Sequence, residues 1–434
     1  MPYQPGKRLP SERASRLGHL DVLKSDLVNN LIAAFNSSAL PPTKPSLPWI
    51  PMPQRESPLR IVLSVDGSVQ NVKSDTKPTK EMAFIKTALL QLDQTAIATI
   101  DPESPHPMAI RDILTNSAMY HATAIPLKNV SISGQSTYHT VRQTIYESLK
   151  DASLEGEPLE TLKWLAYEKW DGKQKSLPTF QCPHCGEKVA TLPYDAEVGN
   201  CPSSSCGGLL YISDFLGFHL DMSQDVVSET VATSYMNIHE TLLLFTGIRH
   251  FWENERSVLE RCLFIKDGPL SLNAQYSKLV TPIQRFLIFA QNQGHTIYMI
   301  GQEKSGYFFD HLELIHKDAP VGSIFIPDNT YIQEEVQSRP LSKYPYGSAT
   351  NYGAKVFVKM NSYHHMVLNI PTGAYIQDPE LSNLIGASRI FSTLPSILSN
   401  RFEGALLPVE LAHGIASLAT YPSAQVFKKF MEVT

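Results

Sequence analysis

Two pairs of closely spaced cysteines are the clearest chemical feature of the sequence. Cys182 and Cys185 form the first pair, Cys201 and Cys206 form the second, and 15 residues (186–200) separate the pairs. Thiolates at this spacing bring two turns together around one tetrahedral Zn²⁺ ion, and four of them leave no position for water. The sequence therefore predicts a structural zinc site. It does not decide whether the surrounding ribbon braces a loop or contacts DNA or a protein.

Two aspartates follow apolar runs, and a glycine comes directly after each of them. Asp66-Gly67 follows LRIVLSV, and Asp267-Gly268 follows CLFIK. The pattern predicts a strand and then a sharp turn at each site, so each aspartate lies either in an exposed turn or in a cleft beyond the sheet. If the two strands are neighbours, the carboxylates converge, and converging oxygen ligands suit Mg²⁺ or Mn²⁺.

Two further candidate residues lie on predicted helices. Glu240 shares a helical face with Leu243 and Leu244, where a carboxylate is costly unless it is paired or binds a metal. The alternative is that Glu240 lies at the edge of the core and reaches solvent. His413 shares the polar face of a late helix with Glu410, and the pattern alone describes an ordinary surface histidine.

Strands and helices alternate along the chain and must position these residues. The pattern predicts strands on both sides of Asp66-Gly67 and a strand over 82–92, mostly helix over 106–170, helix over 227–245, a strand ending at Asp267, helix over 282–293, and a strand over 295–305. After these it predicts paired strands over 353–360 and 364–371 and a helix over 408–419. This alternation indicates the α/β class with a mixed sheet.

Composition divides the chain into three parts. Residues 1–58 carry a helix with regularly spaced leucines and then a proline-rich connector, which should run extended. Residues 59–173 and 214–434 together form one α/β domain. Residues 174–213, rich in Cys, Pro, Gly and Ser, are predicted to be a zinc ribbon inserted into that domain.

The overall charge gives no case for nucleic-acid binding by the whole surface. The formal net charge is −5 at pH 7, so any contact with DNA must be local or shared with a partner. The sequence shows neither a secretory signal nor a run of apolar residues long enough to span a membrane, which predicts a cytoplasmic protein. The fifth cysteine, Cys262, lies in an apolar run and is expected to be a buried thiol.

Five short patches, in order along the chain, resemble the NurA family of nucleases. They are Asp66-Gly67-Ser68, the helix with Glu240, Lys266-Asp267-Gly268-Pro269-Leu270, Lys304-Ser305, and Pro408 with Ala412-His413. The resemblance implies an RNase H-like (Piwi/Argonaute-nuclease-like) mixed sheet flanked by helices, a homodimer, and hydrolysis of DNA with Mn²⁺ or Mg²⁺. It also implies a HerA-like hexameric ATPase as partner, in DNA end processing or anti-phage defence.

The same resemblance implies roles for five residues. Asp66, Glu240 and Asp267 would bind the catalytic metal, and His413 would complete the site. Lys304 would contact phosphate or stabilise charge in the transition state, although it could equally be a solvated loop lysine.

The chain also departs from the NurA pattern. The ribbon is absent from the short archaeal members, and Leu406-Leu407 stands where an active-site tyrosine is expected. Tyr344, Tyr346 and Tyr352 are upstream candidates for that tyrosine. A different class of function stays open, in which a catalytically inactive zinc-ribbon adaptor bridges DNA and a partner protein. An RNA-directed nuclease is a third possibility.

Overall fold

The structure is a computed structural model that describes residues 22–35, 47–53, 56–94, 117–173, 177–187, 189–399, 401–418 and 422–433. The chain divides into two units, Met1–Thr43 and Lys44–Thr434. In the first unit, helix α2 (Asp26–Ala34) begins at Ser25, whose hydroxyl accepts a hydrogen bond from the Val28 amide. Helix α2 confirms the predicted leucine helix at Leu27 and Leu31, whereas Leu23 precedes the first residue of α2, and Leu20 and residues 36–38 lie outside the described residues.

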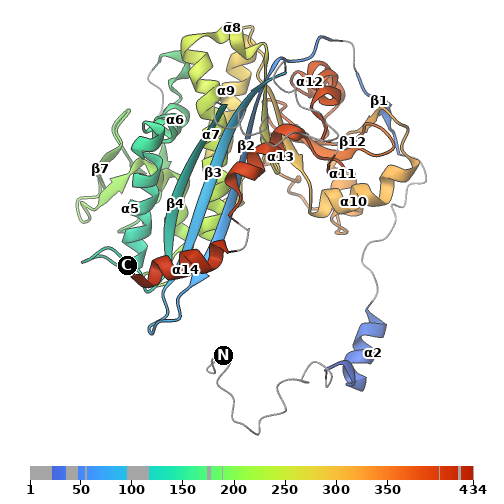
Figure 1. The fold of residues 1–434 in the computed structure, drawn as a ribbon. Helices are drawn as coiled ribbons and strands as arrows, with labels where there is room; N and C mark the ends of the chain where they lie inside the picture. The colour runs from blue at the N-terminus through green and yellow to red at the C-terminus, as the bar shows by residue number, and fades with distance from the viewer. Residues whose placement is uncertain are drawn as a thin grey trace. The chain divides into compact units, whose positions relative to one another are not determined.

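A mixed sheet forms the centre of the second unit (Figure 1). The strand order is β1-β11-β12-β13-β10-β9-β2-β3-β4. Strand β9 pairs in parallel with β2 and with β10, and the other pairings are antiparallel. The strands are β1 (Ile50–Pro51), β2 (Ile61–Lys73), β3 (Glu81–Asp93), β4 (Ala118–Lys128), β9 (Cys262–Asp267), β10 (Tyr298–Glu303), β11 (Ser323–Phe325), β12 (Ala354–Lys359) and β13 (His365–Ile370). The predicted α/β class with a mixed sheet is confirmed.

The prediction of a turn at Asp66-Gly67 is wrong. Strand β2 runs straight through these residues, and its ladder with β3 continues on both sides, with Asp66 opposite Ala88 and Gly67 opposite Thr87. The chain reverses only between β2 and β3, after Lys73. The glycine therefore serves another purpose than a turn, which the packing of a neighbouring helix explains below.

The prediction of mostly helix over 106–170 is wrong for strand β4. This strand pairs with β3 along most of its length, and such cross-strand pairing outweighs the weak helical preference of the sequence. Helices α5 (Thr137–Leu149) and α6 (Glu157–Ala166) confirm the later part of the prediction. Residues 106–116 lie outside the described part of the chain.

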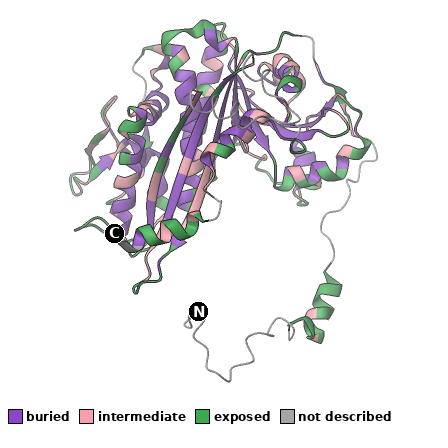
Figure 2. Cartoon of the chain, viewed as in Figure 1, coloured by how far each residue is buried: buried purple, intermediate pink, exposed green. Residues whose placement is uncertain are grey.

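Helices cover both faces of the sheet, and the central strands are largely buried (Figure 2). Successive side chains of β2 and β9 alternate between two cores. Val65 and Phe264 face one core, formed with α5, α6, α7 (Glu229–Asn254) and α9 (Val280–Asn292). Val62 and Ile265 face the other core, formed with α12 (Ala387–Thr393) and α13 (Leu407–Ala416). This alternation decides from which side each candidate residue enters the site.

A smaller core covers the part of the sheet built from β11, β12 and β13. Phe308 and Leu312 of α10 (Tyr307–Ile315) pack there against Phe325 and Phe357. Helix α11 (Asn329–Tyr331) adds Tyr331 to the same core. The predicted pair of late strands is confirmed, because β12 and β13 form a continuous antiparallel ladder.

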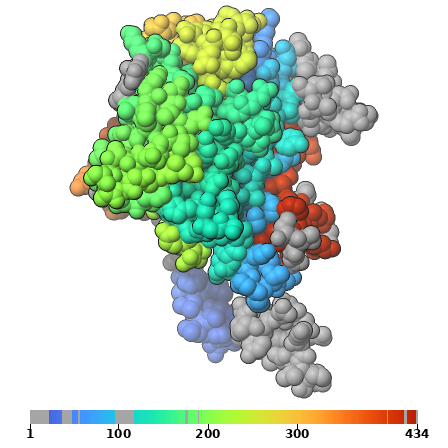
Figure 3. Space-filling view, turned by 90° about the vertical axis from the view of Figure 1, so that its left-hand side faces the viewer, coloured from blue at the N-terminus to red at the C-terminus, as the bar shows by residue number. Residues whose placement is uncertain are grey.

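The cysteine-rich segment forms two short hairpins between α6 and α7 in the chain. The hairpins are β5 (Thr179–Phe180) with β6 (Ala190–Thr191), and β7 (Val198–Asn200) with β8 (Leu209–Tyr211). Figure 3 shows this green segment joined to the teal surface of α5 and α6. Arg142 of α5 fixes it by a buried two-pronged ion pair with Asp214, at 2.9 and 2.8 Å.

Among the described residues, no helix combines the length and apolar composition needed to span a membrane.

Candidate functional site

Asp66 and Asp267 come together because their strands are parallel neighbours. In the ladder between β2 and β9, Val65 lies opposite Lys266, so the next residue on each strand is an aspartate, and both point to the α13 side of the sheet. Strand β9 ends at Asp267, and the chain turns away at Gly268 with φ +83°. The two carboxylates line a cavity of about 490 Å³ beside the part of β2 that continues past β9.

Glu240 enters the same cavity from α7, on the other face of the sheet. A Cβ atom at position 67 would lie 2.6 Å from Glu240 Oε1 and 2.6 Å from Met236 Cγ. Gly67 therefore lets α7 approach the strand closely and gives the glutamate room to reach the cavity. Close approach of the helix, rather than a turn, explains the glycine after Asp66.

Replacing Gly67 with alanine is expected to displace Glu240 and Met236 and to lower the free energy of unfolding by about 1–3 kcal/mol. Denaturant unfolding measures the effect. Gly414→Ala is the matched control, because a Cβ there meets nothing within 4 Å inside helix α13. The free energy of unfolding of this control variant should rise by about 0.5–1 kcal/mol, because alanine is the better helix former. Equal losses in both variants would contradict the close-approach explanation.

Lys266 is a residue of the site that sequence reasoning missed. Its ammonium is fully buried and lies 2.8 Å from Glu240 Oε2 and 2.9 Å from the carbonyl oxygen of Asp267. The signal was present as a lysine inside the apolar run CLFIKD, where a charge needs a buried partner. Glu240 is therefore buried and paired, and its Oε1 points toward Gly67.

His413 and Lys304 each contact one of the aspartates. His413 Nδ1 lies 2.8 Å from Asp66 Oδ2, and 57% of the histidine side chain is exposed. Lys304 Nζ lies 3.0 Å from Asp267 Oδ1. Asp66, Glu240, Asp267 and Lys304 therefore line one cavity, whereas His413 does not line it and is joined to the site through Asp66.

Burial and mutual repulsion shape the electrostatics of the carboxylates. Burial, together with the charges of Asp267 and Glu240, raises the pKa of Asp66 to about 8 against the opposing effect of Lys304. Burial also raises the pKa of Glu240, opposed by Lys266. Carboxylate oxygens are the donors that Mg²⁺ or Mn²⁺ prefers, but among the described residues the ligand atoms of these three carboxylates do not all lie within 4.8 Å of one another.

The raised pKa of Asp66 predicts how the stability of the metal-free protein depends on pH. The pKa of this carboxyl is about 4 in the unfolded chain and about 8 in the folded protein. Its contribution to the free energy of unfolding is therefore fully present below pH 4 and is lost as the pH rises through about 8. Asp66→Asn should therefore stabilise the protein by about 3 kcal/mol above pH 8 in buffer without Mg²⁺ or Mn²⁺. The gain should fall toward zero near pH 4. Urea unfolding across this pH range measures it, and a gain that is independent of pH would contradict the prediction.

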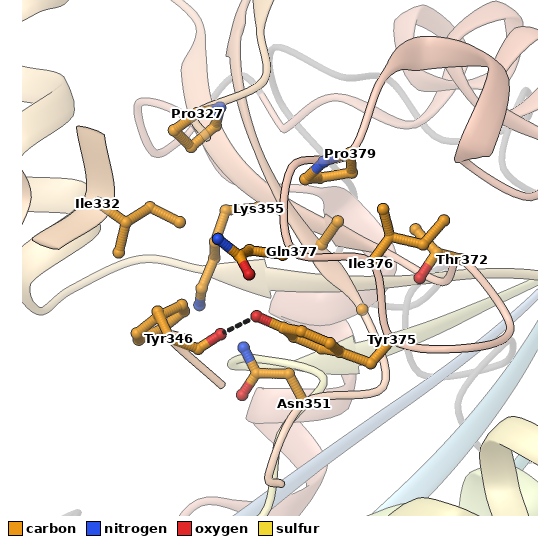
Figure 4. A pocket seen from close by; sticks show the side chains of 12 residues that line it. Pro327, Ile332, Tyr346, Asn351, Lys355, Thr372, Tyr375, Ile376, Gln377 and Pro379 are labelled. Atoms are coloured by element: carbon orange, nitrogen blue, oxygen red, sulfur yellow. Dashed lines mark hydrogen bonds between the residues drawn. The ribbon is translucent and has the colours of Figure 1, made fainter. Parts of the chain in front are cut away.

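Glu303 also lines the cavity, but its charge is already compensated. Buried Lys355 pairs with Glu303 Oε1, and the Asn369 side-chain amide donates to the same oxygen at 2.7 Å. Figure 4 shows Lys355 in a small neighbouring pocket, where the Tyr375 hydroxyl donates to the Tyr346 carbonyl at 2.8 Å. Glu303 is therefore paired with a buried lysine, as Glu240 is with Lys266.

The candidate tyrosines differ in their positions. Tyr344 is exposed, Tyr346 lines the pocket of Figure 4, and Tyr352 is fully buried. The Tyr352 hydroxyl lies 3.5 Å from that of Thr241, on the turn of α7 that carries Glu240. Among the residues described, none of the three tyrosines lines the cavity.

The four cysteine sulfurs form a compact cluster. Cys182 Sγ lies 3.9 Å from Cys206 Sγ, and Cys185 Sγ lies 3.8 Å from Cys201 Sγ. All four lie within 4.8 Å of one another. Sulfurs about 2.3 Å from a tetrahedral zinc ion are separated by about 3.8 Å, so this cluster could hold zinc.

We expect the purified protein to contain about one tightly bound zinc ion per chain, measured by elemental analysis. Cys182→Ser combined with Cys185→Ser removes two of the four thiolates and should lose that zinc, together with a few kcal/mol of stability. Cys262→Ala is the matched control, because this buried thiol lies in β9 and its loss should leave the zinc content unchanged. Full zinc content in the double variant would exclude the cysteine site.

Comparisons with known proteins give little beyond this geometry. No protein-family model matches the sequence, and no curated protein matches it. One matching solved structure is described as a crystal structure of NurA, with 11% sequence identity, 98% coverage of each chain and a TM-score of 0.27. A similarity at this level does not establish a common fold, so the function must be inferred from the site.

Proposed function

We propose that this protein is a metal-dependent DNA nuclease of the NurA type. The observation that carries the proposal is the convergence of Asp66, Glu240 and Asp267, from three separate segments, in one open cavity. Burial and the charges of the two other carboxylates raise the pKa of Asp66, and a bound divalent cation would lower it again.

The protein residues divide the work of phosphodiester hydrolysis. Asp66 and Asp267 would hold Mn²⁺ or Mg²⁺, and Glu240, kept in place by Lys266, would supply a third oxygen ligand. When bound, the metal lowers the pKa of an attacking water and stabilises charge on the scissile phosphate. His413 orients Asp66 and completes the site, and its exposed ring edge can hold a proton. Lys304, beside Asp267, contacts the phosphate.

The arrangement of the strands supports the RNase H-like part of the proposal. In β4-β3-β2-β9-β10, an antiparallel meander is extended by two parallel strands. Asp66 and Asp267 lie on the adjacent strands β2 and β9. Residues 59–173 and 214–434 then form the nuclease domain, with the ribbon of 174–213 inserted and residues 1–58 preceding it.

The charge of the chain supports a division of labour with a partner. With a net charge of −5, a nuclease gains from a motor that delivers the DNA. We propose a cytoplasmic homodimer that acts with a HerA-like hexameric ATPase in DNA end processing or anti-phage defence.

The test is a cleavage assay with labelled single-stranded DNA, double-stranded DNA and RNA, in Mn²⁺, in Mg²⁺ and without divalent metal. We expect cleavage of DNA only when metal is present, and its loss in Asp66→Asn. Asp225→Asn is the matched control, since Asp225 is exposed and lies outside the cavity. No cleavage by the wild-type protein, with or without a HerA-like partner, would leave the zinc-ribbon adaptor as the better function. Cleavage confined to RNA would indicate the RNA-directed alternative.

A further inference from the structure

A glutamate and two histidines converge on the opposite side of β10 from β9. Glu313 lies in α10, His316 follows at the end of that helix, and His365 begins β13. One ligand atom from each lies within 4.8 Å of the others. We propose that these three side chains bind a divalent transition-metal ion such as Zn²⁺, at a site separate from the four cysteines and from the carboxylate cavity.

The fold presents the three groups together from two elements. Glu313 and His316 are three residues apart, so both lie on the same face at the end of α10. The ring of His316 stacks on that of His365, with centroids 4.1 Å apart and 8° between the planes, so one ring must rotate before both Nε2 atoms can face the same ion. His365 is 1% exposed, whereas 46% of the Glu313 side chain is exposed. A buried ligand thus anchors a site that an ion can enter from solvent.

The acceptors beside the two rings differ. His316 Nδ1 lies 3.2 Å from the Leu312 carbonyl oxygen, and a proton on that Nδ1 leaves Nε2 with a free lone pair, the arrangement typical of histidines that bind metals. Among the described residues, the buried Nδ1 of His365 has no hydrogen-bond partner, although Glu403 Oε1 is 3.5 Å away. His365 Nε2 lies 2.5 Å from Glu313 Oε1, which is the separation of a hydrogen bond, so a metal ion would have to displace the shared proton and move the two atoms apart.

The donor set indicates the class of ion. Two imidazoles and one carboxylate suit Zn²⁺, Ni²⁺ or Co²⁺ better than Mg²⁺ or Ca²⁺, which prefer oxygen ligands. Three protein ligands leave a coordination position open to water or another donor.

An ion at this site would link two segments, and a third segment packs beside them. Glu313 and His316 belong to the α10 segment and His365 to β13. The third segment is the loop before α13, which contributes Glu403 and packs closely on β13, since a Cβ at Gly404 would lie 2.3 Å from the His365 carbonyl oxygen. The inference does not depend on the proposed nuclease function.

Calorimetric titration of the whole protein with Zn²⁺ tests the proposal. The cysteine-bound zinc is left in place, and excess Mg²⁺ occupies the carboxylate cavity while competing poorly for imidazole. We expect one binding event in the wild-type protein, weakened at least about 100-fold in His316→Ala and in Glu313→Gln. These two side chains are only partly buried or exposed, so both variants should fold. His250→Ala, an exposed histidine at the end of α7, is the control and should bind like the wild type.

Anomalous diffraction at the zinc edge locates the ion and should give a peak between the three side chains. The proposal is overturned if the wild-type protein shows no binding event, or if His316→Ala and Glu313→Gln bind as tightly as the control. A zinc peak elsewhere, with none beside His365, would also overturn it.

Discussion

Asp267→Asn is expected to lower the rate of metal-dependent DNA cleavage about 1,000-fold, because the neutral amide holds a divalent cation far more weakly than a carboxylate. A factor of 1,000 corresponds to about 4 kcal/mol, which is within the transition-state stabilisation that a catalytic metal provides. Asp267 is the ligand that ends β9, and no neighbouring carboxylate on that strand can replace it. Single-turnover cleavage at saturating Mn²⁺ measures the effect, and the binding of Mn²⁺ itself should weaken in parallel.

Lys304→Met is the comparison that separates metal binding from phosphate contact. Lys304 pairs with Asp267, so its removal leaves the carboxylate free and should not weaken Mn²⁺ binding. Cleavage should nevertheless fall by about 10- to 100-fold, because a positive charge near the phosphate is lost.

If Asp267→Asn cleaved DNA at the wild-type rate, Asp267 would not belong to the catalytic centre.

Lys266→Met is expected to lower the free energy of unfolding by about 3–5 kcal/mol. The side chains of Lys266 and Glu240 are 2% and 4% exposed and lie 2.8 Å apart. Removing the lysine leaves a buried carboxylate without its counter-charge, which is the costly way to break such a pair. Urea unfolding in buffer without Mg²⁺ or Mn²⁺ measures the loss, and Mn²⁺ should restore part of it by supplying another positive charge.

Two further variants test the physical reason. Lys266→Met combined with Glu240→Leu removes both charges and should recover most of the lost stability. Lys150→Met is the control, because Lys150 pairs with Glu197 at the surface with 49% of its side chain exposed. Such a pair contributes about 0–1 kcal/mol. A double variant no more stable than Lys266→Met would show that packing, rather than the unpaired charge, causes the loss.

The sequence was most informative where local patterns are strong. The apolar run that ends at Asp267 and the long helix around Glu240 both form as predicted. The four cysteines lie together as their spacing requires. The expected convergence of Asp66 and Asp267 was conditional on neighbouring strands, and β2 and β9 are parallel neighbours.

The errors arose where a local signal has two meanings. Asp-Gly is the usual sequence of a tight turn. At Asp66-Gly67, however, strand β2 continues, because it stays paired with β3 both before and after these two residues. The segment that forms β4 has no strong period of its own, and its pairing with β3 decides its conformation. Lys266 was overlooked because its partner, Glu240, lies 26 positions away in the chain.

The sequence by itself determined the chemistry of this protein: which residues carry carboxylate, thiol, imidazole and ammonium groups, and which local segments form helices and strands. Only the tertiary structure decided which of these groups meet. Asp66 meets His413 across 347 positions, and Gly67 admits Glu240 through the absence of a Cβ atom. The reason is physical, since periodicity and turn propensity act over a few residues, whereas strand order and helix packing depend on burying surfaces that lie far apart in the chain.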